Sequence, residues 1–214
     1  MRSEAALLDR LVAAWAATPG WEILAVALAV AYLLLAVRQN PWCWAAAFVS
    51  TAIFTVLFWN VQLPMQSALN GYYMVMAVYG WWAWRHGGKH DTPLPIRRWP
   101  LGYHVAALAA IGLAAVASGA LLTAHGDAAR PYLDALITWG AVVTTFMVAR
   151  KVLENWAYWM VINSLAVVLF VDRGMLPTAG LHAAYLVISV FGWRAWLRDA
   201  RAQDERVGKQ ESAP

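Results

Sequence analysis

Charged residues are scarce in this sequence. Only 13% of its 214 residues are Asp, Glu, Lys or Arg, whereas 62% are hydrophobic. Soluble domains average about 25% charged and 45–50% apolar residues. A chain of this composition has too little polar surface for a fold that contacts only water, and it is predicted to lie in a membrane.

Alternating hydrophobicity is also lacking. A transmembrane β-strand alternates apolar and polar side chains over about 10 residues, but residues 23–37 and 105–122 form continuous apolar runs. A helix satisfies all its backbone hydrogen bonds within one such segment. The sequence therefore predicts an all-α, polytopic membrane protein.

Cysteine and histidine are too few for a disulfide or metal framework. The single cysteine, Cys43, cannot form an internal disulfide, and we interpret it as a packing residue. His86 and His90 lie four residues apart, but a closed metal site normally needs three or four ligands. A solvated loop is the simpler interpretation, and we expect no metal site.

Residues that would attach a cofactor or carry out catalysis are missing as well. The three lysines, Lys89, Lys151 and Lys209, lie outside the predicted spans, so a Schiff-base cofactor has no attachment point. His104 lies at a span edge and His182 stands alone, so no facing histidine pair can ligate haem. No G-x-S-x-G nucleophile motif occurs. We expect no enzyme activity and no cofactor.

Seven stretches are long and apolar enough to cross a membrane, which takes a helix of about 20 residues. They are residues 21–37, 42–59, 63–84, 101–123, 132–149, 155–171 and 175–197. Residues 1–19 hold one unbroken apolar patch, residues 11–17, which is too short to span, and charges interrupt the residues before it; this predicts an amphipathic surface segment. The polar tail 198–214 is predicted to be disordered.

Lysine and arginine are distributed unevenly between the two sides that seven spans define. The N-terminal side holds 4 of them and the C-terminal side 12. Cytoplasmic loops collect Lys and Arg, so we expect the N-terminus outside, and the 86–100 linker and the C-terminus in the cytoplasm, for a protein integral to the cell (inner) membrane. The net charge of +4 follows from this bias, so membrane lipid and not nucleic acid is the expected partner. A homo-oligomer is left open.

The sequence repeats itself at an offset of 112 residues. Residues 20–85 align with 132–197 without a gap, and 18 of the 66 positions are identical. The matches include tryptophans and glycines, among them Gly80 with Gly192 and Trp84 with Trp196. Two three-helix units are predicted.

The span at 101–123 lies between these units and returns the second copy to the orientation of the first. The predicted architecture is therefore 3+1+3 with two parallel repeats. Parallel repeats are typical of transporters that bind a small-molecule substrate at the repeat interface, near the bilayer midplane. The alternative is that duplication only enlarged the bundle.

Three spans carry stripes of polar and aromatic side chains at helical spacing. The stripes are Gln66, Asn70 and Tyr73; Asn155, Trp159 and Asn163; and Thr178, His182 and Tyr185. Amides within a membrane either join helices or bind a ligand. Trp44, Trp156, Trp159, Tyr73 and Tyr185 are the aromatic residues predicted to form a cage around a flat or cationic ligand.

The spans hold no Lys or Arg near their middle, and their acidic residues lie near the ends. A phosphorylated substrate would require basic clamps, so a neutral or cationic nucleoside-like molecule fits better. Ion coupling usually leaves a carboxylate within the membrane. The sequence therefore favours facilitated diffusion.

Two segments resemble a known family. Residues 150–163 contain Glu154-Asn155-Trp156 and a W-x-x-x-N pattern at Trp159 and Asn163, and residues 66–84 follow the pattern of the family's third helix. These features resemble the PnuC transporters over nearly all of residues 20–197.

The resemblance implies a SWEET-like 3+1+3 fold and uptake of nicotinamide riboside, which cytosolic phosphorylation then traps. It also implies that Trp159 and Asn163 contact the ligand, with Asn155, Gln66, Asn70, Tyr73 and Tyr185 as neighbours. His182 occupies the place of Asn70 in the second repeat. Thiamine remains an alternative substrate, and a membrane scaffold or sensor without transport an alternative function.

Overall fold

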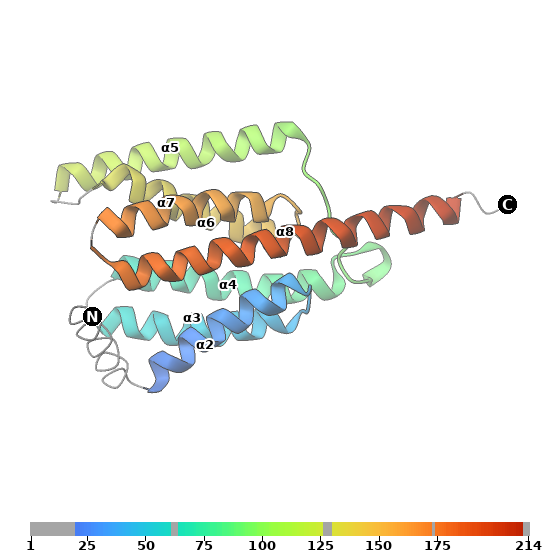
Figure 1. Ribbon diagram of the computed structural model, residues 1–214, viewed down its shortest axis with the longest axis horizontal. Helices are drawn as coiled ribbons and strands as arrows, with labels where there is room; N and C mark the ends of the chain where they lie inside the picture. The colour runs from blue at the N-terminus through green and yellow to red at the C-terminus, as the bar shows by residue number, and fades with distance from the viewer. Residues whose placement is uncertain (1–19, 61–63, 126–129, 173, 212–214) are drawn as a thin grey trace, which may run out of the picture.

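The chain folds into a bundle of long helices (Figure 1). The computed structural model describes residues 20–60, 64–125, 130–172 and 174–211, so the predicted segment 1–19 lies outside the described residues. The helices are α2 (Gly20–Val37), α3 (Trp42–Asn60), α4 (Pro64–His86), η1 (Lys89–Asp91), α5 (Leu101–His125), α6 (Pro131–Ala149), α7 (Asn155–Asp172) and α8 (Leu176–Glu211). The described residues contain no strand, only one isolated bridge between Arg97 and Val152.

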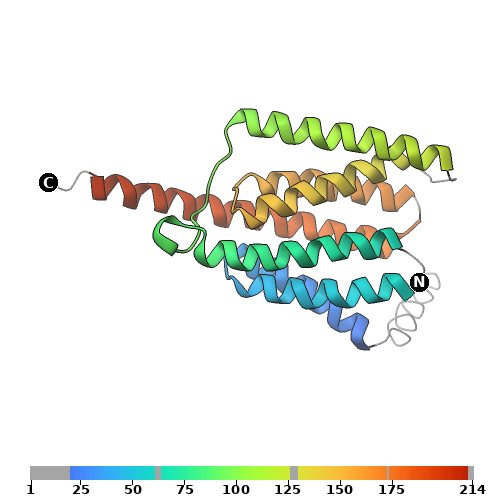
Figure 2. The same cartoon turned by 180° about the vertical axis from the view of Figure 1, so that it is seen from behind.

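Five of these helices, α2, α3, α5, α6 and α7, are long and apolar enough to cross a membrane. α4 and α8 run along the same bundle (Figures 1 and 2). Large apolar side chains such as Leu113, Val75 and Trp59 are exposed on the outer faces. This is the arrangement expected where lipid is the solvent, and the chain is an all-helical, polytopic membrane protein.

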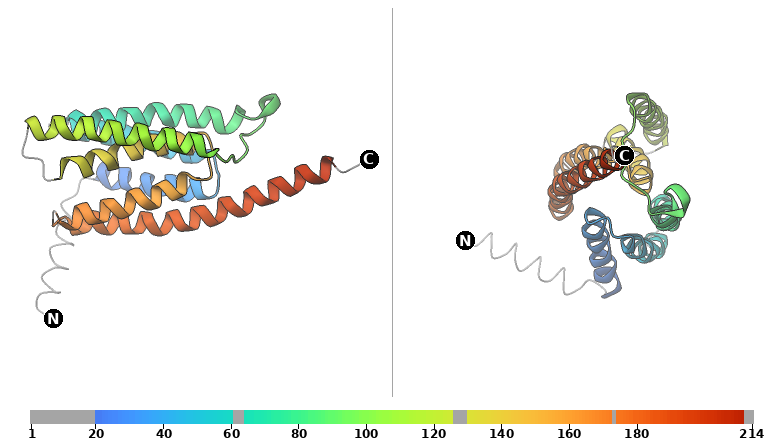
Figure 3. Two further views of the ribbon diagram at one scale, coloured as in Figure 1. Left: turned by 90° about the horizontal axis from the view of Figure 1, so that it is seen from above. Right: turned by 90° about the vertical axis from the view of Figure 1, so that its right-hand side faces the viewer.

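The helices pack in two groups of three. α3 contacts both α2 and α4, and α7 contacts both α6 and α8. The groups meet where α4 packs on α6 and where α2 packs on α8, while α5 packs on α6 (Figure 3). The bundle end at which α2, α4 and α6 finish also carries residues 87–100, and we call it the linker end.

The turns that close α2 and α6 have the same backbone geometry at the 112-residue offset. Gln39 and Lys151 both adopt left-handed conformations, with φ of 54° and 49°. Their backbone N–H groups donate to Ala36 and Val148, respectively, at 3.0 Å in both cases. Equivalent residues therefore build equivalent turns, and both turns lie at the linker end.

Four buried tryptophans fill the core between these turns, and we call them the tryptophan layer: Trp44, Trp84, Trp156 and Trp196. The ring centroids of Trp44 and Trp84 are 5.5 Å apart at 86°, and those of Trp156 and Trp196 are 5.5 Å apart at 85°. Trp84 and Trp196, one from each group, are 5.9 Å apart. Edge-to-face packing of this kind is favourable between aromatic rings.

The prediction of a disordered tail from residue 198 is wrong for the part that the structure describes. α8 continues to Glu211 and projects beyond the other helices (Figure 3). Gln203 exchanges two hydrogen bonds with the backbone of Ile96, and Asp199 accepts one from Gln39 at 2.7 Å. These contacts and the high helix propensity of Ala, Arg and Gln offset the polarity on which the prediction was based.

Candidate substrate site

A polar pair, the buried Asn163 and the half-buried His182, joins α7 to α8 within the bundle. The Nδ1 atom of His182 and the Oδ1 atom of Asn163 are 2.9 Å apart. Asn163 Nδ2 donates to the carbonyl oxygen of Trp159, one turn earlier, at 2.9 Å. Because this bond orients the amide, Oδ1 faces the imidazole, and Nδ1 of His182 must carry the proton.

Two aromatic rings contact the imidazole of this pair. The Phe170 ring stacks on the His182 ring with centroids 5.2 Å apart at 19°. The Tyr185 ring meets the same imidazole edge-on at 5.8 Å and 80°. Trp159 is half-buried and packs against the core. The structure thus brings the predicted residues Asn163, His182 and Tyr185 together, and Trp159 joins them through its backbone carbonyl.

The corresponding positions of the first three-helix group are different. Thr51 is equivalent to Asn163 and makes the same bond to the carbonyl one turn earlier, Ala47, at 2.8 Å. A threonine has no second polar group that could reach a neighbouring helix. The amide and imidazole pair is therefore confined to α7 and α8, which makes the chemistry of the bundle asymmetric.

The predicted residues on α4 are placed less completely. Tyr73 is half-buried with its ring 5.6 Å from that of Tyr72, and Tyr72 donates to the carbonyl of Val142 at 3.0 Å. Asn70 is half-buried and engaged in a contact. Gln66 belongs to α4, but its side chain lies outside the described residues. No hydrogen bond or ring contact joins Tyr73 to His182 in the part of the chain that the structure describes.

Three residues that the sequence predicts to contact a ligand lie in the core. Trp44, Trp156 and Asn155 are 2%, 1% and 0% exposed. The Asn155 amide donates to the carbonyl of Val152 at 2.6 Å, and the two indoles belong to the tryptophan layer. In the described conformation packing inside the protein covers all three side chains, so their contact with a ligand stays a prediction.

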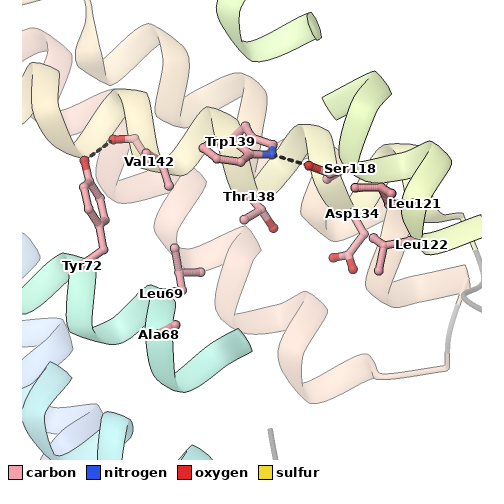
Figure 4. Close-up of a pocket in the computed structure, with 11 residues that line it drawn as sticks. Ala68, Leu69, Tyr72, Ser118, Leu121, Leu122, Asp134, Thr138, Trp139 and Val142 are labelled. Carbon is pink, nitrogen blue, oxygen red and sulfur yellow. Dashed lines mark hydrogen bonds between the residues drawn. The ribbon is translucent and has the colours of Figure 1, made fainter. Parts of the chain in front are cut away.

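The structure also contains a cavity of about 520 Å³ between α4, α5 and α6 (Figure 4). Its lining consists of Ala68, Leu69, Tyr72, Ser118, Leu121, Leu122, Asp134, Ala135, Thr138, Trp139 and Val142. Trp139 Nε1 donates to Ser118 Oγ at 2.9 Å, which joins α6 to α5. Most of this lining is apolar, with one carboxylate from Asp134.

The sequence interpretation missed Asp134, Thr138, Trp139 and Ser118. Asp134 and Thr138 lie at i and i+4, so they share a helical face, and that spacing could have identified the α6 part of the lining. Ser118 comes from α5, and only the packing of α5 on α6 brings it near. No three His, Cys, Asp or Glu side chains gather as a metal site within the described ranges.

Comparison with known proteins identifies relatives that are transporters. The family model described as "Nicotinamide mononucleotide transporter" matches residues 20–198. The nicotinamide riboside transporter PnuC of Escherichia coli (strain K12) is 26% identical over 184 residues, which are 74% of this chain and 77% of the relative. The riboflavin/roseoflavin transporter RibM of Streptomyces davaonensis is 26% identical over 185 residues, 85% of each chain.

A solved structure shares the fold. The crystal structure of the vitamin B3 transporter PnuC superposes with a TM-score of 0.68 at 18% identity, covering 91% of this chain and 88% of that one. The match of the family model extends over most of the helical bundle. The chain belongs to the nicotinamide mononucleotide transporter family.

Proposed function

We propose that this protein carries nicotinamide riboside across the cell (inner) membrane by facilitated diffusion, and that cytosolic phosphorylation traps the product. The observation that carries the proposal is the Asn163–His182 pair within the bundle, whose imidazole contacts the rings of Phe170 and Tyr185. The relatives named nicotinamide riboside transporter and vitamin B3 transporter support the substrate class.

The chemistry of the pair suits a carboxamide on an aromatic ring. After its bonds to Trp159 and His182, the Asn163 amide still has one N–H and one oxygen lone pair. A carboxamide offers the complementary acceptor and donor. The faces of Trp159 and Tyr185 suit a pyridinium ring, for which a favourable cation–π contact contributes about 0.5–2 kcal/mol.

The transport pathway in this proposal runs between two parallel three-helix repeats, α2–α4 and α6–α8, which α5 connects in a 3+1+3 arrangement. The matching turns at Gln39 and Lys151 support this, because both lie at the linker end of the bundle. The excess of Lys and Arg there favours a cytoplasmic linker end and an external N-terminus.

A riboside fits the site better than the mononucleotide in the family description. Within the described residues, neither Lys nor Arg contacts the Asn163–His182 pair. A phosphate in such a place would lack the basic partners that usually balance its charge. No carboxylate contacts the pair in the described ranges either, which favours transport that is independent of an ion gradient.

Uptake into proteoliposomes tests the proposal. Labelled nicotinamide riboside should enter saturably, and a protonophore or sodium ionophore should leave the initial rate unchanged. Asn163→Ala should reduce saturable uptake at least tenfold, the effect of losing about 1.4 kcal/mol or more of binding. Ser164→Ala is the matched control, because Ser164 is the next residue but is exposed on α7.

The proposed substrate is refuted if nicotinamide riboside neither enters nor competes, whereas another vitamin does. Thiamine belongs in that competition assay as a second cationic aromatic vitamin. If a vitamin binds to the protein but no vitamin enters the proteoliposomes, the scaffold or sensor alternative is supported.

Riboflavin is the second candidate substrate. RibM is as similar in sequence as PnuC of Escherichia coli, at 26% identity, and its match covers more of this chain, 85% against 74%. Riboflavin is uncharged, which also suits a site without basic residues. A direct competition between riboflavin and nicotinamide riboside distinguishes the two.

A further inference from the structure

The tryptophan layer joins the two three-helix groups by one contact made twice. Trp84 Nε1 donates to the carbonyl of Val148, and Trp196 Nε1 donates to the carbonyl of Ala36, both at 3.0 Å. Trp84 and Trp196 are 112 residues apart, and so are Ala36 and Val148. Each group therefore inserts an indole into the helix end of the other, and all four residues lie at the linker end.

Two further hydrogen bonds between the groups lie at the same end. Gln39 Nε2 donates to Asp199 Oδ2 at 2.7 Å, which joins the α2–α3 turn to α8. Arg150 donates to the hydroxyl oxygen of Tyr79 at 3.0 Å, which joins the α6–α7 turn to α4. The described conformation is therefore closed where the two turns meet.

Some buried polar atoms in and beside this closed layer lack hydrogen-bond partners. Among the described residues, three buried side-chain polar atoms have no hydrogen-bond partner, namely Nε1 of Trp44, Nε1 of Trp156 and Oδ1 of Asn155. Buried polar atoms without partners are uncommon, and each disfavours the state in which it occurs. Water would bond to all three if the layer opened, so hydration opposes the reciprocal bonds that close it.

The linker extends across the same end and holds several elements together. Leu94 donates its backbone N–H to Trp84 O at 3.2 Å. Ile96 exchanges hydrogen bonds of 3.3 and 3.4 Å with Gln203 of α8. Arg97 exchanges bonds of 2.9 and 2.8 Å with the α6–α7 turn. Separation of the two groups at this end requires some of these bonds to break.

We infer that the tryptophan layer is the gate at the linker end of the translocation pathway, and that it opens when the two reciprocal tryptophan bonds release. The inference rests on the proposed transport function, because a gate has a role only in a protein that transports a substrate. Its test needs no ligand, however, so a wrong substrate assignment cannot be mistaken for failure of the gate.

The single cysteine provides the test, because Cys43 is a free thiol within this layer and 0% exposed. The rate at which a maleimide labels Cys43 in nanodiscs measures how often the layer opens. Trp84→Phe and Trp196→Phe should each raise that rate about fivefold, the factor expected for loss of one ordinary hydrogen bond. Trp82→Phe, whose indole is 57% exposed on α4, should leave it unchanged.

A second reporter distinguishes opening of a gate from general loosening. In a Cys43→Ser background, Ser67→Cys places a nearly isosteric thiol at the far end of α4, where Ser67 is 5% exposed. Trp84→Phe should not raise its labelling rate. Should either tryptophan variant destabilise the fold, Gln203→Ala tests the gate through the linker, with the exposed Glu205→Ala as control.

Faster labelling of Cys43, without faster labelling of the Ser67→Cys reporter, supports the gate. Equal Cys43 rates in the wild-type protein and the folded variants overturn the inference. Parallel increases at both reporters overturn it too, because the layer would then be only a structural core.

Discussion

Gly192 is the position at which a single methyl group should be most informative. A Cβ atom there would lie 2.6 Å from three atoms of the Trp156 ring, about 1 Å closer than carbon atoms in ordinary contact. Trp156 cannot move away easily, since it is 1% exposed and packs edge-on against Trp196. Gly192→Ala should therefore overpack the layer at a cost of about 1–3 kcal/mol.

Gly180 provides the matched control on the same helix, because a Cβ atom there meets nothing within 4 Å. Gly180→Ala should stabilise α8 by up to about 1 kcal/mol, the difference between glycine and alanine in a helix. For a chain of this size, 1 kcal/mol corresponds to roughly 2–4 °C in Tm. Gly192→Ala should thus melt roughly 2–12 °C below the wild type, and Gly180→Ala slightly above it.

Thermal melts followed by Trp fluorescence in one detergent, at one scan rate, measure both variants. Gly80→Ala adds a test of the duplication, because its Cβ atom would lie 2.3 Å from Trp44, the equivalent clash in the first group. If Gly192→Ala melts at or above Gly180→Ala, the tryptophan layer is not tightly packed and the reasoning from it is wrong.

Three further predictions concern titratable and polar groups. Burial lowers the pKa of Lys151, in the α6–α7 turn, to about 8, below the usual lysine value of about 10.4. Between these two pKa values the unfolded chain binds more protons, so stability should rise with pH from about 8 to 10. Lys151→Met should abolish this rise in Tm and the exposed Lys89→Met should keep it, whereas an unchanged slope in Lys151→Met would contradict the assignment. Uptake by the wild type and by Asp134→Asn should both be insensitive to a proton gradient. Gradient-dependent uptake in the wild type that disappears in Asp134→Asn would refute uniport. His182→Phe should leave Asn163 Oδ1 without its partner, lowering stability by about 1–3 kcal/mol and weakening substrate binding, which melts with and without nicotinamide riboside measure.

The sequence by itself determined the helical membrane class, since 13% charge and long apolar runs leave no other way to satisfy the backbone in lipid. It also singled out Asn163 and His182 as polar residues within otherwise apolar spans, which must find partners, but only the structure shows that they pair with each other. The 112-residue offset, read from matched tryptophans and glycines, anticipated the equivalent turns at Gln39 and Lys151.

Only the tertiary structure decided which aromatic residues are buried in the core. Trp44 and Trp156 have the same composition and spacing signals as Trp159, yet Gly80 and Gly192 provide hollows that the first two indoles fill. Whether a ring is buried in a core or lines a site depends on the surface of another helix, which spacing along one helix does not contain.

The course of the C-terminal tail was likewise decided by contacts distant in sequence. Its charges predicted disorder, but Gln203 meets Ile96 107 residues away, and Asp199 meets Gln39 160 residues away. Helix propensity read from local composition predicts the folded structure only weakly, whereas these partners exist only once the linker and the α2–α3 turn have folded against α8. The cavity beside Asp134 depends on α5 and α6 in the same way, because no single helix encloses it.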